Sequence, residues 1–196
     1  MTLRRLLPSL PAGDVILAVG ILLVEVFAAT QARAGDGSFS AAIGGLPIPA
    51  WIALIIGSAV LVVRRHRPLA VLAVVVAAYA VWHLLGYADG PSLAIIVAMY
   101  GVGRYIADLR PSALAVIVAT GVFVVVAFRD GDPMADIALA ATVVPFLPWY
   151  IGRRVAARQE RVRLLEERAE LLERERATEL RQVVEEERRS IARELH

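Results

Sequence analysis

Apolar residues dominate the first three quarters of the chain and form six long stretches separated by short polar segments. A helix that crosses the roughly 30 Å hydrocarbon core of a bilayer needs about 20 mostly apolar residues. Prolines inside such a helix are tolerated where neighbouring helices satisfy the freed backbone groups, and the last stretch contains Pro145 and Pro148. The pattern predicts six membrane-spanning helices, at about residues 13–30, 47–63, 68–86, 91–107, 111–128 and 134–151.

Arginine is concentrated in alternate loops between these stretches. The richer set is Arg4, Arg5, Arg64, Arg65, Arg67, Arg104, Arg110, Arg153 and Arg154, whereas the other loops hold Arg33 and Arg129. Cytoplasmic loops of membrane proteins carry the excess of positive charge. The alternation predicts a multi-pass protein of the plasma membrane with both termini in the cytoplasm, which agrees with an even number of spans.

The remaining loops give little room for a domain outside the bilayer. Residues 31–46 form the longest loop and are rich in Gly and Ala. Such a segment is too short to fold as a domain, so we expect any stimulus to act in the bilayer, at its surface or through a membrane partner. Arg4, Arg5 and the apolar run after them resemble a signal peptide, but Glu25 interrupts the run and five more spans follow, so we expect no cleavage.

A few polar residues fall inside the predicted spans. Glu25 lies in the first span, where an unpaired carboxylate would cost a few kcal/mol. It is either a sensing site or a hydrogen-bonded structural residue. His83 lies near the outer end of the third span with Tyr79 and Trp82. This group indicates either an aromatic interface belt or a pH-sensing histidine.

Composition divides the chain into an apolar block and a charged tail. Hydrophobic residues make up 58% of the chain, which is high for a soluble domain. Residues 152–196 nevertheless hold 12 of the 21 basic residues, interleaved with 11 Glu. Because basic and acidic residues nearly balance in this tail, we do not expect it to be a nucleic-acid-binding arm. There is no Cys, which excludes disulfides and thiolate metal sites.

The tail has the composition of a long helix, because residues 153–196 contain no Gly or Pro. Apolar positions at heptad-like spacing predict a parallel coiled coil over residues 152–186 and therefore a homodimer. The register changes near residues 173–177. Opposite charges four residues apart, such as Glu170 and Arg174, also fit a solitary solvated helix. The expected dimer seam is Val162, Leu165, Ala169, Leu172, Leu180, Val184, Ile191 and Leu195.

Residues 187–196 read Glu-Arg-Arg-Ser-Ile-Ala-Arg-Glu-Leu-His. This decamer resembles the start of the phosphoacceptor domain of bacterial sensor histidine kinases, in the subfamily paired with LuxR-type response regulators. The layout of several spans, short loops and a coiled coil is similar to that of the multi-span sensors common in actinobacteria. The resemblance implies an all-α membrane protein: residues 1–151 form a sensor domain, followed by the coiled coil and the first dimerisation helix.

The resemblance also implies a chemistry for this segment. His196 would accept a phosphoryl group from ATP, with Mg²⁺, and pass it to an Asp of a response regulator that has a helix-turn-helix output domain. On a helix, Arg189 and Arg193 share the face of His196, where they would favour a neutral imidazole and could contact phosphate. No nucleotide-binding motif is present, so we expect this chain alone to bind no cofactor and to be catalytically inert.

A second interpretation comes from another functional class. The chain could be a small membrane transporter or scaffold whose tail is an assembly helix. Intramembrane charges would then line a pathway, and Glu25 is the residue that fits such a role.

Overall fold

The protein is all-helical throughout the part of the chain described by the structure, a computed structural model covering residues 12–34, 46–87, 92–131 and 133–194. Side chains in the tail are described as far as Gln182. The helices are α1 (Ala12–Ala34), α3 (Ile48–Ala59) with the 3₁₀ turn η2 (Val60–Val63), α4 (Pro68–Leu84), α5 (Ser92–Tyr105), α6 (Leu109–Asp130) and α7 (Met134–Glu194). Each of the six apolar stretches of the sequence coincides with one of these helical segments, and the all-α prediction is confirmed.

The number of full-length spans is smaller than the sequence predicts. Within the described residues, two segments are long and apolar enough to cross a membrane, Ala12–Thr30 and Leu109–Asp130. The shorter apolar helices are Ile48–Val63, Pro68–Leu84 and Ser92–Tyr105. Each of these helices ends before it reaches the length of about 20 residues that a full span needs. For example, α5 has 14 residues, which extend about 21 Å.

Local signals explain where several helices begin and end. Pro68 occupies the first turn of α4, where the missing N–H of proline has no intrahelical partner to lose. Gly131 ends α6 with a φ of 79°, a left-handed conformation that glycine adopts without a Cβ penalty. Pro145 and Pro148 lie inside α7, which continues through both, as the sequence analysis assumed for a helix packed among others.

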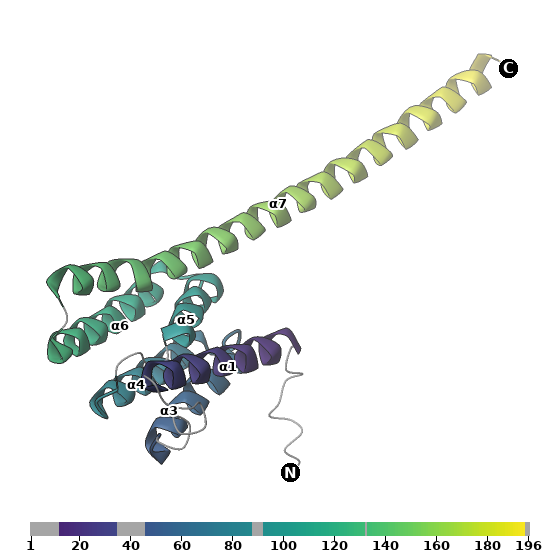
Figure 1. The fold of residues 1–196 in the computed structure, drawn as a ribbon. Helices are drawn as coiled ribbons and strands as arrows, with labels where there is room; N and C mark the ends of the chain where they lie inside the picture. Colours follow the sequence, from purple (N-terminus) through teal and green to yellow (C-terminus); the bar gives the residue numbers. More distant parts are fainter. Residues whose placement is uncertain (1–11, 35–45, 88–91, 132, 195–196) are drawn as a thin grey trace, which may run out of the picture. The chain divides into compact units, whose positions relative to one another are not determined.

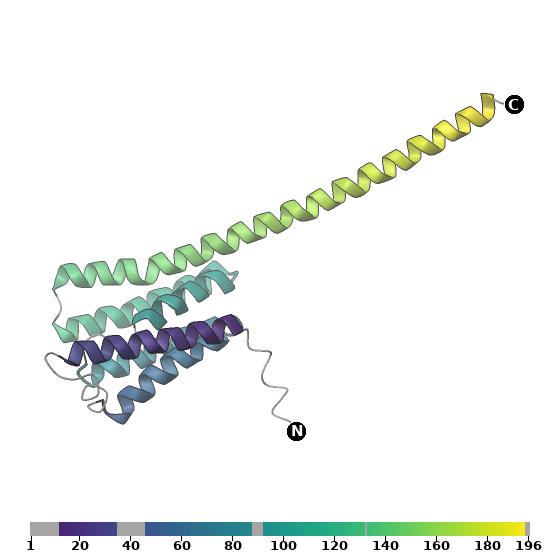
Figure 2. The same cartoon turned by 45° about the vertical axis from the view of Figure 1, so that its right-hand side comes forward.

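The chain divides into two compact units, residues 1–154 and 155–196, and each is described by itself. In the first unit α4 is the central helix and packs against α3, α5 and α6, while α1 packs against α3 and α5 (Figures 1 and 2). The buried core is made mainly of small and branched apolar side chains, including Val75, Ala98 and Val116.

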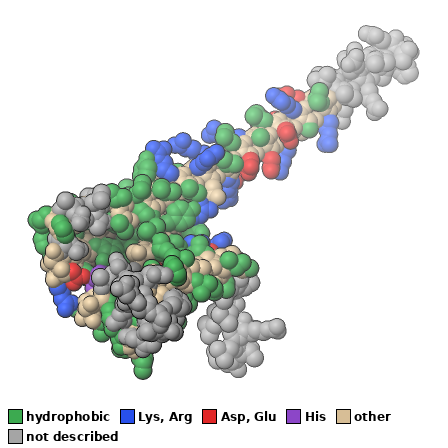
Figure 3. Space-filling view, in the orientation of Figure 1, with side chains coloured by type: hydrophobic (Ala, Val, Ile, Leu, Met, Phe, Trp, Pro, Cys, Tyr) green, Lys and Arg blue, Asp and Glu red, His purple; other side chains and the backbone are tan. Residues whose placement is uncertain are grey.

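The outer face of this unit is strongly apolar. Figure 3 shows hydrophobic side chains spread over the visible face of the helices of residues 12–154. On α1, Ile16 is 72% exposed and Leu23 is 65% exposed, and α6 exposes Leu114 and Val125 in the same way. Soluble monomers rarely expose so much contiguous apolar surface, so this face needs an apolar environment or a partner.

The second unit is the helical tail, and its charged side chains are visible in Figure 3. Its large apolar side chains are exposed, among them Val162, Leu165, Leu172 and Leu180 of the expected seam. The expected pair Glu170–Arg174 is present at 3.6 Å, and Arg163 pairs with Glu167 at 3.0 Å. The tail is therefore a helix in this single chain, and its pairing into a coiled coil stays a prediction.

Candidate functional site

Glu25 is buried between three segments and joins them through hydrogen bonds. Its side chain accepts a hydrogen bond from Ser58 Oγ at 3.0 Å and another from the backbone N–H of Ala94 at 2.8 Å. Ala94 lies in the first turn of α5, whose N–H groups have no partner within the helix. The Glu25 side chain therefore caps α5 from a neighbouring helix, where it accepts a hydrogen bond from an N–H group that has no intrahelical partner.

Asp14 forms a second buried cluster near the start of α1. It is fully buried, and its Oδ1 accepts hydrogen bonds from Arg64 Nη2 at 2.7 Å and from Arg65 Nη2 at 3.2 Å. The Arg65 Nε also pairs with Asp14 Oδ2. The hydrogen bond to Asp14 raises the pKa of Arg65 above its ordinary value, so this guanidinium stays charged. The cluster ties the start of α1 to the segment that follows η2.

His83 makes a third contact at the other end of α4. Its Nδ1 lies 2.6 Å from Asp130 Oδ2, which joins the last turns of α4 and α6. The imidazole also packs on Tyr79, with 4.4 Å between the ring centroids. His83 Nε2 is buried and has no hydrogen-bond partner within the described residues. The interpretation of this region as an interface belt is wrong for Trp82, which is 2% exposed and belongs to the core beneath Tyr87.

Two glycines let α5 and the apolar part of α7 approach backbone to backbone. A Cβ on Gly103 would collide with the carbonyl oxygen of Trp149, and a Cβ on Gly152 would collide with the carbonyl oxygen of Tyr100. Small residues at such crossings allow close helix packing where the hydrophobic effect gives no driving force. Gly103 therefore has a packing role.

The same crossing is stabilised by polar contacts from α7 to the connection between α5 and α6. Arg153 Nη1 donates to the carbonyl oxygen of Ile106 at 3.3 Å and to Ser112 Oγ at 3.4 Å. Trp149 Nε1 donates to the same hydroxyl at 3.4 Å. These contacts fix residues 149–153 immediately before the tail begins.

The predicted phosphoacceptor residues fall at the edge of what the structure describes. His196 and Leu195 lie outside the described residues. Arg189 and Arg193 lie on α7, as do Val184 and Ile191, and their side chains lie outside the description. Ala169 is exposed, like the other described positions of the expected seam. The structure thus places the backbone of Val184, Arg189, Ile191 and Arg193 on one helix, and the proposed roles of these residues and of His196 stay predictions.

Several residues of the buried clusters were missed by sequence reasoning. Asp14, Ser58 and Gly152 were not singled out, and Arg64 and Arg65 were interpreted as free cytoplasmic cations. One signal was available for Asp14, since an acidic residue in the first turn of a span needs a partner and the arginine-rich loop is predicted on the same side. Ala94 follows Glu25 by 69 positions in the sequence, so no local pattern reveals that contact.

No family model, curated protein or solved structure matches this chain. Within residues 12–34, 46–87, 92–131 and 133–194, no group of three or more His, Asp or Glu side chains could hold a metal ion. The described clusters are pairings between helices, and their polar atoms are engaged with one another, with the exception of His83 Nε2. These contacts join α1 to α3, to α5 and to the segment after η2, and they join α4 to α6.

Proposed function

We propose that this chain is the membrane-embedded input part of a sensor histidine kinase, with α7 as its output helix and His196 as the phosphoacceptor. The observation that carries the proposal is the apolar exterior of the described residues of the first unit. Large aliphatic side chains such as Ile16, Leu23 and Val125 are exposed there, while Asp14, Glu25 and Ser58 are buried. Water disfavours an exterior of this kind, so lipid is the solvent that suits this unit.

The two longest apolar helices support this environment. A core helix of a soluble protein would be mostly buried, but 22% of the residues in the apolar window of α1 and 28% of those in α6 are buried. Their exposed surfaces would face acyl chains. The shorter helices would then complete the bundle as spans. For example, α4 has 17 residues and extends about 25 Å, and local thinning of the bilayer can absorb this mismatch.

In this proposal both ends of the chain are in the cytoplasm. The cluster of Asp14 with Arg64 and the contacts of Arg153 then lie on the cytoplasmic side, whereas the His83–Asp130 pair lies on the outer side. A change in helix packing within the bilayer would reach the tail through the glycine crossing at Gly152. Two such tails would pair along Val162, Leu165 and Leu172, which are exposed in the single chain.

The kinase chemistry belongs to the segment after this stalk. By the resemblance of residues 187–196, an ATP-binding domain with Mg²⁺ would phosphorylate His196, and a response regulator with a helix-turn-helix domain would receive the phosphoryl group. The role of Arg189 and Arg193 would be to contact that phosphoryl group. The chain of 196 residues has no ATP site of its own that we recognise, so the activity would require further sequence.

The transport alternative draws less support from the geometry. Glu25 is its candidate pathway residue, but that carboxylate is hydrogen-bonded to Ser58 and to the N-terminus of α5. These hydrogen bonds give Glu25 a structural role in the bundle, so a transport pathway is not needed to explain its position.

The reading frame downstream of codon 196 gives a direct test. We expect the next codon to encode Asp or Glu, followed within the same frame by an Asn-containing ATP-binding domain. Membranes holding that longer protein should then incorporate the γ-phosphate of ATP, and the substitution His196→Gln should abolish the labelling. The 196-residue chain should stay unlabelled. A stop codon at position 197, or labelling that survives His196→Gln, would contradict the proposal.

A further inference from the structure

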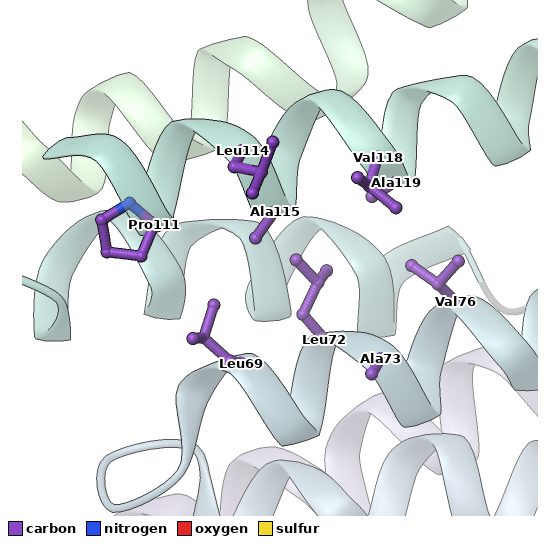
Figure 4. A pocket seen from close by; sticks show the side chains of 9 residues that line it. All are labelled: Leu69, Leu72, Ala73, Val76, Pro111, Leu114, Ala115, Val118 and Ala119. Atoms are coloured by element: carbon purple, nitrogen blue, oxygen red, sulfur yellow. The ribbon is translucent and has the colours of Figure 1, made fainter.

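An apolar groove lies between α4 and α6. Figure 4 shows its lining, with Leu69 and Pro111 at one end and Val76 and Ala119 at the other. The groove has a volume of about 330 Å³. Both helices begin at the end of Leu69 and Pro111. Every lining side chain is apolar, and the remaining members are Leu72, Ala73, Leu114, Ala115 and Val118.

Exposed cations adjoin that same end of the groove. Arg67 precedes Leu69 by two residues and Arg110 immediately precedes Pro111, and both side chains are exposed. Arg64 and Arg65 share the single carboxylate of Asp14, whereas Arg67 and Arg110 form no ion pair among the residues that the structure describes. Asp108 is the nearest acidic residue in the sequence, so positive charge remains in excess at this end.

The chemistry of the groove and of its surroundings indicates what can occupy it. The lining is apolar, and exposed cations adjoin one end. This combination matches a ligand that carries an anionic group at the end of a hydrocarbon chain. An acyl chain is a single methylene wide and fits a groove of this shape. Inside a bilayer an acyl chain is surrounded by hydrocarbon both in the groove and outside it, so it gains only packing contacts by entering the groove. The selectivity between lipids must therefore come from the headgroup.

We propose that the α4–α6 groove is a binding site for one acyl chain of an anionic phospholipid of the inner leaflet, with Arg67 and Arg110 holding its phosphate headgroup. The inference depends on the membrane embedding and inner-side orientation proposed above. Each basic residue near the surface contributes to the attraction of anionic lipid. A bound lipid would bridge the starts of α4 and α6 and so bias the packing of the bundle that leads to α7.

The test uses the full chain purified in detergent micelles and native mass spectrometry with added phosphatidylglycerol or phosphatidylcholine. We expect a preference for phosphatidylglycerol. Ala73→Phe should fill the groove and remove the preference, whereas Ala70→Phe, on the same helix but outside the lining, should keep it. Arg67→Ala and Arg110→Ala should each weaken binding roughly fivefold. Arg129→Ala, at the opposite end of α6, should have no effect.

The outcomes separate this inference from the proposed function. Equal binding of the two lipids, equal effects of Ala73→Phe and Ala70→Phe, or a change of oligomeric state in place of lipid binding would overturn the lipid site and leave the membrane embedding intact. A chain that is extracted from membranes by alkaline carbonate would overturn both. Circular dichroism of each variant shows whether it is folded, so that lost binding is attributed to the groove.

Discussion

Two carboxylates on α1 show how a small number of polar residues can organise an apolar helical bundle. Asp14 holds Arg64 and Arg65, and Glu25 holds Ser58 and the N-terminus of α5. A charge is costly in an apolar interior unless it is paired or hydrogen-bonded. Each of these carboxylates therefore favours the arrangement of helices that brings its partners within reach. Because α1 makes both contacts, the position of this helix along its axis is fixed at two points.

Replacing Glu25 tests its role as a cap. Glu25→Ala leaves the Ser58 hydroxyl and the Ala94 N–H without their partner, so we expect the free energy of unfolding to fall by about 2–3 kcal/mol. Glu25→Gln keeps a carbonyl acceptor and should lose about half as much. Thermal unfolding in detergent, followed by circular dichroism, measures both. Glu25→Ala with the stability of the wild-type protein would exclude the capping role.

The same pair of variants addresses sensing. If Glu25 detects a stimulus in the intact kinase, Glu25→Gln should keep the fold but change the response. If it acts as a cap alone, signalling should follow stability in both variants.

The presence of Glu25 in the first span was evident from the sequence, but its partners were not. Ser58 and Ala94 come from other helices. Hydropathy located α5 well, since the helix Ser92–Tyr105 begins close to the predicted start at residue 91 and ends two residues before the predicted end at 107. Hydropathy did not show which side chain caps this helix, because a tertiary contact is absent from a local pattern.

At the scale of elements, the crossing of α5 and α7 depends on the absence of two side chains. Gly152→Ala and Gly103→Ala each place a methyl group against a backbone carbonyl, which cannot yield as a flexible side chain would. We expect each to lower the free energy of unfolding by roughly 1–3 kcal/mol. Thermal unfolding in detergent, read from the fluorescence of Trp149 and the other tryptophans, measures the effect.

Matched controls for this prediction are available within the same chain. Gly20 in α1 and Gly121 in α6 have open space where a Cβ would lie. Gly20→Ala and Gly121→Ala should leave stability unchanged or raise it by up to about 1 kcal/mol, because alanine favours a helix. If all four variants behave alike, the close approach of α5 and α7 is not important for the fold.

The tail is the element for which sequence and structure agree on helix but leave pairing open. Its exposed leucines favour pairing, while its ion pairs also suit a solitary helix. Since the chain has no Cys, Leu165→Cys and Leu172→Cys introduce unique thiols. Both should form disulfide-linked dimers on mild oxidation in membranes, whereas Glu167→Cys on the opposite face should not. Equal cross-linking at all three positions would indicate random collisions.

At the scale of the whole molecule, the arginine-rich segments that the structure describes lie at one end of the bundle. Arg64 lies close to Gly101 on α5, and α5 meets α7 at Gly103. Arg4, Arg5 and the side chain of Arg33 lie outside the described residues. His83 and Asp130 meet at the ends of α4 and α6 that lie away from the arginine-rich end. Composition could predict this division because each loop carries its own charges, whereas no loop reveals that Asp14 neutralises Arg64.

The orientation of the bundle is the last prediction, and it decides whether the tail can work in the cytoplasm. Met134 is 69% exposed at the start of α7, and Arg158 is exposed in the tail. A membrane-impermeant maleimide should label Met134→Cys in intact cells and should label Arg158→Cys after the membrane is opened. The cysteine-free chain gives the background. Labelling of Arg158→Cys in intact cells would place the tail outside, where neither ATP nor a response regulator could reach His196. If neither variant were labelled in intact cells, Met134 would not lie at the outer surface. The even number of spans, on which the predicted orientation depends, would then be wrong.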